Sequence, residues 1–117
     1  VSVAAALAVQ DIFEKENIFK KVKEMSPYFL DAIFSLKDIS GVDNIRGYGM
    51  LAGIDMKLKE KPGRAGFECF KACYDAGVNF KATGDCLIIA PQFICEKKHI
   101  DEIIEKLRTG ISNYMKK

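Results

Sequence analysis

The chain has 117 residues, of which 49% are hydrophobic and 29% are charged, and its formal net charge is +2. This composition is typical of one folded domain and excludes an intrinsically disordered chain. Residues 1–44 hold five Lys and seven Asp or Glu (net −2), and residues 45–117 hold 13 Lys or Arg and nine Asp or Glu (net +4). Neither part has a basic block dense enough to predict a nucleic-acid partner.

The first 13 residues predict a helix that is apolar nearly all round. Ten of them are apolar and four are Ala, the best helix former. Such a helix is normally buried on every side, which a domain of this size rarely achieves for its own terminus. We therefore expect this helix to pack against a part of the protein that lies outside the chain. A dimer contact or a frayed end remains the alternative.

The same segment gives an expectation for where in the cell the protein is found. The apolar run is too short to span a bilayer, and no basic region precedes it as in a signal peptide. The cysteines, Cys69, Cys73, Cys86 and Cys95, do not have the pattern of a secreted disulfide scaffold. A chain that begins at Val1 instead of Met indicates an excised fragment. We expect a fragment of a cytoplasmic protein without a membrane partner.

A second helical pattern follows over residues 18–37. Its apolar stripe has helical spacing and consists of Val22, Met25, Phe29, Ile33 and Leu36. Because the stripe keeps its phase across Pro27, we predict one long helix with a kink at that proline. The expected organisation is therefore a long interdomain helix over 1–40, kinked near Pro27, followed by a small domain over 41–117.

The rest of the chain alternates between strand and helix patterns. Residues 50–58 alternate with period two and predict a strand, residues 64–76 a helix, residues 78–81 and 86–90 two short strands, and residues 97–115 a closing helix. The predicted fold class is α+β, with a small antiparallel or mixed three-stranded sheet and helices on one face.

Two groups of residues are candidates for metal or nucleophilic chemistry. The Cys69-x₃-Cys73 and Cys95-x₃-His99 pairs have a spacing that is barely admissible for zinc, and core packing explains Cys73 better. His99 has no activated nucleophile in its sequence neighbourhood. We predict no metal site and no catalytic residue in this chain.

Two glycine-containing motifs are candidates for ligand binding. Residues 46–49 (Arg-Gly-Tyr-Gly) lead into a strand instead of a helix, so they predict a tight turn and no phosphate site. Residues 81–85 (Lys-Ala-Thr-Gly-Asp) place Lys81 at a strand end before a turn, where it either binds an anionic ligand or is simply solvated.

Four stretches in register resemble the C-terminal small domain of class III (omega-type) aminotransferases, which are fold-type I enzymes that use pyridoxal phosphate. They are residues 3–14, residues 45–54, residues 77–91 and residues 100–103. The similarity extends over nearly the whole chain in the order and spacing of the family. The residues corresponding to the long helix between the family's large and small domains are 1–37.

The resemblance implies amino transfer from an amine or omega-amino acid to a keto acid such as pyruvate. It also implies a homodimer. In the family, the lysine that holds the cofactor and the residues that bind its phosphate and pyridine nitrogen lie upstream. Pyridoxal phosphate would therefore be bound by a large domain of the same polypeptide, and this chain contains no cofactor-binding residue.

One functional position carries over by the resemblance. In omega-amino acid–pyruvate enzymes an arginine just before the Gly-Asp turn binds the substrate carboxylate, and the matching residue here is Lys81. Lysine keeps the charge but loses the two-pronged guanidinium geometry. Residues 91–93 are Pro-Gln-Phe where the family usually has two prolines and a leucine. The alternative to an enzyme domain is a stand-alone α+β binding or regulatory module, or a fragment that docks through its first helix.

Overall fold

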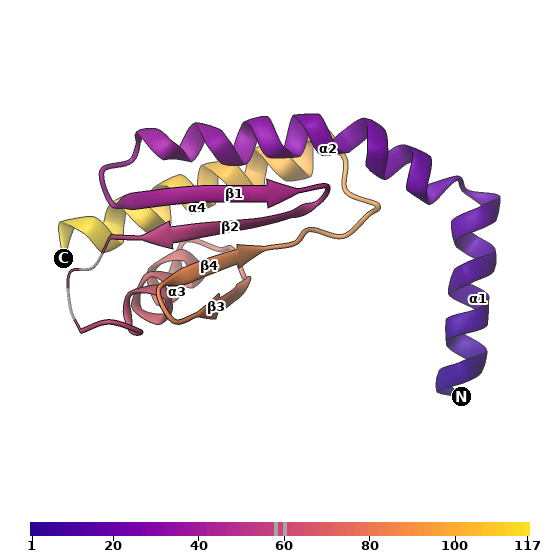
Figure 1. The fold of residues 1–117 in the computed structure, drawn as a ribbon, viewed down its shortest axis with the longest axis horizontal. Coiled ribbons are helices and arrows are strands. Elements are labelled where there is room, and N and C mark those ends of the chain that lie inside the picture. The colour runs from indigo at the N-terminus through magenta and orange to yellow at the C-terminus, as the bar shows by residue number, and fades with distance from the viewer. Residues whose placement is uncertain (58, 60) are drawn as a thin grey trace.

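A computed structural model of the chain describes residues 1–57, 59 and 61–117 (Figure 1). The elements in chain order are α1 (Ser2–Lys15), α2 (Ile18–Phe34), the 3₁₀ turn η1 (Ser35–Asp38), β1 (Val42–Tyr48), β2 (Leu51–Met56), α3 (Ala65–Asp75), β3 (Lys81–Thr83), β4 (Cys86–Ile89) and α4 (Lys97–Lys116). The four strands form one antiparallel sheet in the order β1-β2-β4-β3. The expected α+β class is confirmed.

The sheet has four strands where the sequence predicted three. The missing strand is β1, whose residue pairing with β2 shifts between Val42 and Asn44. This irregularity breaks the alternation of buried and exposed residues that would have revealed a strand. The motif at residues 46–49 therefore lies mostly within β1, and Gly49, with a φ of 60°, begins the hairpin turn to β2. The strand expected over 50–58 is shorter, and Leu58 lies outside the described residues.

The N-terminal region is helical as expected, but its break is elsewhere. Two helices replace the single helix over 1–40, and they meet at Glu16 and Asn17. Asn17 has a φ of 52°, the left-handed conformation that Asn tolerates better than most residues. Pro27 lies inside α2 and does not end it. Figure 1 shows α1 directed away from the rest of the chain at this bend.

The helices α2, α3 and α4 cover one face of the sheet and form a single core with it (Figure 1). The large side chains that are fully buried come from α2, η1, β2, β4 and α4 and include Phe29, Ile33, Leu36, Ile54, Leu87, Ile100, Leu107 and Ile111. Each such side chain contributes roughly 1.5–3 kcal/mol by leaving water. Cys69 and Cys73 are also fully buried, which agrees with a packing role.

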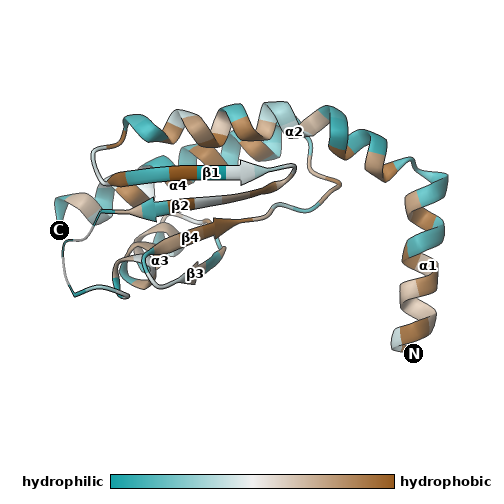
Figure 2. Cartoon of the chain, in the orientation of Figure 1, coloured by the Kyte–Doolittle hydropathy of each residue, from teal (hydrophilic) through white to brown (hydrophobic). Residues whose placement is uncertain are grey.

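The helix α1 has no buried residue. Leu7 is 64% exposed, and the apolar N-terminal half of the helix is free along its length (Figure 2). Its C-terminal end contacts the rest of the chain through Phe13, whose ring centroid is 5.0 Å from that of Phe19 and 6.3 Å from that of Phe93. None of the described helices combines the length and the apolar character that crossing a membrane requires.

Candidate functional site

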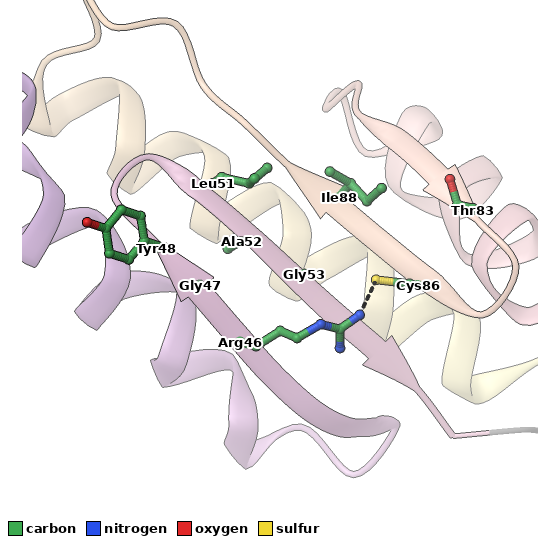
Figure 3. A pocket seen from close by; sticks show the side chains of 9 residues that line it. All are labelled: Arg46, Gly47, Tyr48, Leu51, Ala52, Gly53, Thr83, Cys86 and Ile88. Atoms are coloured by element: carbon green, nitrogen blue, oxygen red, sulfur yellow. Dashed lines mark hydrogen bonds between the residues drawn. The ribbon is translucent and has the colours of Figure 1, made fainter.

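The face of the sheet opposite the helices is open. Side chains alternate between the two faces of a strand, and Ala52, Ile54 and Met56 of β2 point into the core. The open face therefore carries their neighbours and the residues paired with them: Arg46, Tyr48, Leu51, Gly53, Asp55, Lys81, Thr83, Cys86 and Ile88. Figure 3 shows most of these residues around a shallow hollow of about 660 Å³.

One row of paired residues crosses this face through all four strands. Arg46 pairs with Gly53, Gly53 with Ile88, and Ile88 with Lys81. Directly paired residues of antiparallel strands project from the same face, so Arg46 and Lys81 are the two cations of this row. Adjacent strands are about 4.8 Å apart, which places the backbones of Arg46 and Lys81 roughly 14 Å apart. Because Gly53 has no side chain, the hollow reaches down to the sheet backbone beside Arg46.

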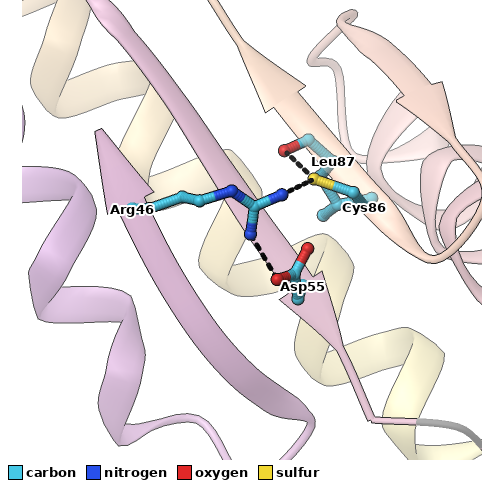
Figure 4. Close-up of polar contacts among 4 residues, drawn as sticks. All are labelled: Arg46, Asp55, Cys86 and Leu87. Carbon is cyan, nitrogen blue, oxygen red and sulfur yellow. Dashed lines mark hydrogen bonds and ion pairs between the residues drawn. The ribbon is translucent and has the colours of Figure 1, made fainter. Parts of the chain in front are cut away.

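The charge of Arg46 is already partnered. Its guanidinium forms an ion pair with Asp55 and donates a hydrogen bond to Cys86 Sγ at 3.6 Å (Figure 4). The hydrogen bond from Arg46 lowers the pKa of the Asp55 carboxyl, so the carboxylate stays charged. Burial, followed by the nearby Asp55, raises the pKa of the Cys86 thiol. This cluster therefore joins β1, β2 and β4 and does not hold an activated thiolate.

Lys81 differs from Arg46 in having a free charge. It is exposed on β3, which is an edge strand, and none of the described residues forms an ion pair with it. Its pairing partner Ile88 lines the hollow, and so does Thr83 two residues further along β3. The open face thus has a largely apolar hollow and, on the adjoining edge strand, an exposed lysine without an ion pair among the described residues, an arrangement suited to an organic anion.

The other candidates from the sequence are His99 and the cysteines spaced as candidate metal ligands. His99 Nδ1 accepts a hydrogen bond from the Glu96 backbone N–H at 3.0 Å in a capping box at the start of α4. Within the described part of the chain, no group of three or more His, Cys, Asp or Glu side chains is placed to hold a metal ion.

Comparison with known proteins gives the family of the chain. The sequence model of the class-III aminotransferases matches residues 1–111. The chain belongs to the class-III aminotransferase family. It is 33% identical over 106 residues to the omega-aminotransferase of Caulobacter vibrioides, covering 90% of this chain and 24% of that protein. It is 34% identical over 116 residues to the putrescine–pyruvate aminotransferase of Pseudomonas aeruginosa, covering 91% of this chain and 25% of that protein.

Solved structures agree with this assignment. The adenosylmethionine-8-amino-7-oxononanoate aminotransferase of Methanocaldococcus jannaschii matches with a TM-score of 0.84 and 26% identity over 93% of this chain and 26% of that chain. A transaminase structure with L-alanine matches in fold with a TM-score of 0.89 and 22% identity, over 97% of this chain and 28% of that chain. This class-III aminotransferase chain therefore spans about a quarter of the length of the relatives that it matches.

Class-III aminotransferases generally use pyridoxal phosphate, and the hollow of this chain does not fit that group by itself. The cofactor is held through a lysine as a Schiff base, and none of the described residues that line the hollow on the open face is a lysine. Lys81 lies beside the hollow on the edge strand and not within its lining. The lining of this hollow therefore lacks the lysine that a Schiff base to the cofactor requires.

Sequence reasoning missed the cluster of Arg46, Asp55 and Cys86, as well as the hydrogen bonds made by Asp85. The Asp85 carboxylate accepts hydrogen bonds from the backbone N–H groups of Gly63 and Ala65. The only sequence signal for the first cluster is the alternation of residues 50–58, which indicates a second, more polar face of β2.

Proposed function

We propose that the chain is the C-terminal small domain of a pyridoxal-phosphate-dependent transaminase and forms one wall of its substrate cleft. The observation that carries this proposal is the unpaired ammonium group of Lys81 at the edge of an apolar hollow, in a chain of the class-III aminotransferase family. Two relatives are named as an omega-aminotransferase and a putrescine–pyruvate aminotransferase. Amino transfer from an amine or omega-amino acid to a keto acid such as pyruvate is the reaction that this supports best.

In this proposal Lys81 binds the carboxylate of the substrate. Its ammonium group acts as a point charge with three donors, so it attracts a carboxylate without imposing a planar, two-pronged geometry. The apolar side chains of Leu51 and Ile88 exclude water from the carbon chain of the substrate and so strengthen this attraction. Lys81 thus orients the substrate and takes no part in proton transfer.

The cofactor belongs to the upstream part of the same polypeptide. When bound there, pyridoxal phosphate supplies the electron sink for the reaction. The exposed apolar surface of α1 supports a large domain as its neighbour, because free apolar helices of this kind are normally covered. We also propose that the full-length protein is a homodimer, as the resemblance to the family implies, and that it is found in the cytoplasm.

The experiment is a substitution of Lys81 in the full-length protein. K81A should raise KM for a carboxylate-bearing donor or acceptor about 10- to 100-fold, the range for a lost charged hydrogen bond. KM for a neutral amine donor should change less than about twofold. K81R should retain carboxylate binding, because guanidinium keeps the charge and can donate two parallel hydrogen bonds to a carboxylate.

The matched control is K37A, since Lys37 is an exposed lysine on η1, outside the sheet. This control should leave KM unchanged for both substrates. Equal effects of K81A on carboxylate-bearing and neutral substrates would reject the assignment of Lys81.

A further inference from the structure

The strand that carries Lys81 is weakly held by its own pairing. The strand β3 has three residues and lies at the edge of the sheet, where β4 is its single neighbour. The other strand of the hairpin, β4, is also paired with β2, so β3 is the less supported of the two strands. Lys81 lies at the start of this strand, so its position relative to the hollow depends on whatever fixes the hairpin.

The turn of this hairpin is bonded to the amino end of α3. Both carboxylate oxygens of Asp85 accept a hydrogen bond from the Gly63 N–H at 2.9 Å, and Oδ1 accepts a second from the Ala65 N–H at 3.0 Å. The residue before α3, Arg64, makes no capping hydrogen bond with its side chain. Asp85 therefore caps α3 from 20 residues further along the chain, and its negative charge suits the positive end of the helix dipole.

Backbone contacts at the same turn leave little room for another arrangement. The Gly66 N–H donates to the Gly84 carbonyl oxygen at 3.0 Å, and a Cβ on Gly66 would lie 2.5 Å from that oxygen. Gly84 has a φ of 58°, as required at the first position of a two-residue hairpin turn of type II′. The Met56 N–H donates to the Asp85 carbonyl oxygen at 2.9 Å, which joins the turn to the end of β2.

We propose that Asp85 is a positioning residue for substrate binding: its carboxylate ties the β3–β4 hairpin to α3 and thereby places Lys81 beside the hollow. This inference rests on the proposed function, in which Lys81 binds the substrate carboxylate. The helix α3 is itself fixed in the core by Cys69 and Cys73, so it serves as the rigid support of the hairpin. A displacement of about 1 Å in a binding group is enough to weaken its interaction with substrate.

The inference predicts the behaviour of D85A in the full-length protein. Loss of the carboxylate removes the side-chain tie between the hairpin and α3 and loosens the hairpin, so KM for a carboxylate-bearing substrate should rise about 2- to 30-fold, the range for a lost helix cap. KM for a neutral amine should change less than about twofold. In the K81A background, D85A should add no further increase for the carboxylate-bearing substrate, because the residue that it positions is already absent.

Two further variants make the result decisive. D85N keeps one acceptor oxygen, so it should recover part of the binding of the carboxylate-bearing substrate. If D85A does not fold, D85N is measured in its place. E96A removes the side-chain cap of α4 and serves as the stability control. It should lower the unfolding temperature to a similar degree and leave the ratio of the two KM values unchanged.

Several outcomes would overturn the inference. They are an equal effect of D85A on both substrates, no effect on either, or an undiminished effect of D85A in the K81A background. A carboxylate-selective effect of D85A without one of K81A would also overturn it. The K81A variant alone tests the proposed function, so failure of that function is seen separately from failure of the role of Asp85.

Discussion

At the scale of single residues, the two cations of the row across the open face are chemically different. Arg46 is neutralised by Asp55, whereas Lys81 faces no carboxylate among the described residues. A substrate carboxylate that approaches Arg46 must compete with a carboxylate of the same chain that is already in place. Selection of an anion by this face is therefore expected at the β3 edge and not at the β1 edge.

The Cys86 thiol provides a test of the Arg46 cluster. Its pKa lies above the ordinary value, first because of burial and then because of Asp55, whereas Arg46 acts in the opposite direction. D55N leaves burial unchanged but removes the contribution of the Asp55 charge that raises the pKa, while Arg46 still lowers it, so the thiolate fraction at pH 8 should increase. Alkylation of Cys86 by iodoacetamide, followed residue by residue with mass spectrometry, should be faster in D55N than in the native protein.

The control for this measurement is D38N. Asp38 also pairs with an arginine, Arg108, at 2.7 Å, but this pair links η1 to α4. The D38N variant should therefore leave the alkylation rate of Cys86 unchanged. An unchanged or slower rate in D55N would show that Asp55 does not suppress the thiolate.

At the scale of elements, the closest helix contact is between α3 and α4. A Cβ on Gly110 would lie 2.5 Å from Cys73 Cα, a backbone atom that cannot move cheaply. Without this contact, G110A would stabilise α4 by up to about 1 kcal/mol, because Ala favours helices more than Gly. With it, we expect G110A to destabilise the protein by about 1–3 kcal/mol, measured by thermal unfolding.

The neighbouring exposed position supplies the control for G110A. Asn113 is exposed on the same helix, so N113A should change the unfolding temperature little or raise it slightly. A stabilised G110A variant would mean that the two helices are not as close as their backbones indicate.

Elements with a regular pattern were predictable from the sequence, and the irregular ones were not. The closing helix was expected over 97–115 and is Lys97–Lys116, because its apolar residues repeat without interruption. The strand β1 was missed because its register shift hides the alternation. The sequence predicted a kink at Pro27 and no break at Asn17, since a proline is a clearer signal of an irregular helix than an asparagine that adopts a left-handed conformation.

The candidate site was only partly predictable for a different reason. Lys81 is predicted as a substrate-binding residue because it lies inside a contiguous motif that resembles the family, and this role stays a prediction. The Arg46 cluster requires the pairing of three strands, and the cap made by Asp85 joins residues 20 positions apart. Contacts of this kind depend on tertiary structure, which the spacing of residues along one sequence does not contain.

At the scale of the whole molecule, α1 is the feature that most needs a partner. Four of its large apolar side chains are exposed, namely Val3, Leu7, Val9 and Ile12, and so is Val1 directly before it. Only Phe13, at the far end of the helix, contacts aromatic rings elsewhere in the described chain. A protein about four times as long, as the relatives are, offers a surface to cover this helix.

This reasoning predicts how a hydrophobic dye binds to the protein. The isolated 117-residue chain should enhance the fluorescence of anilinonaphthalene sulfonate several-fold more than the full-length protein, because α1 is uncovered only in the former. A chain that begins at Asn17 should lose most of this enhancement, whereas L36A, a change inside the core, tests whether general loosening gives the same signal. Equally weak fluorescence from the isolated chain and the full-length protein would instead favour a self-contained module, because a stand-alone domain must shelter its own apolar surface in solution.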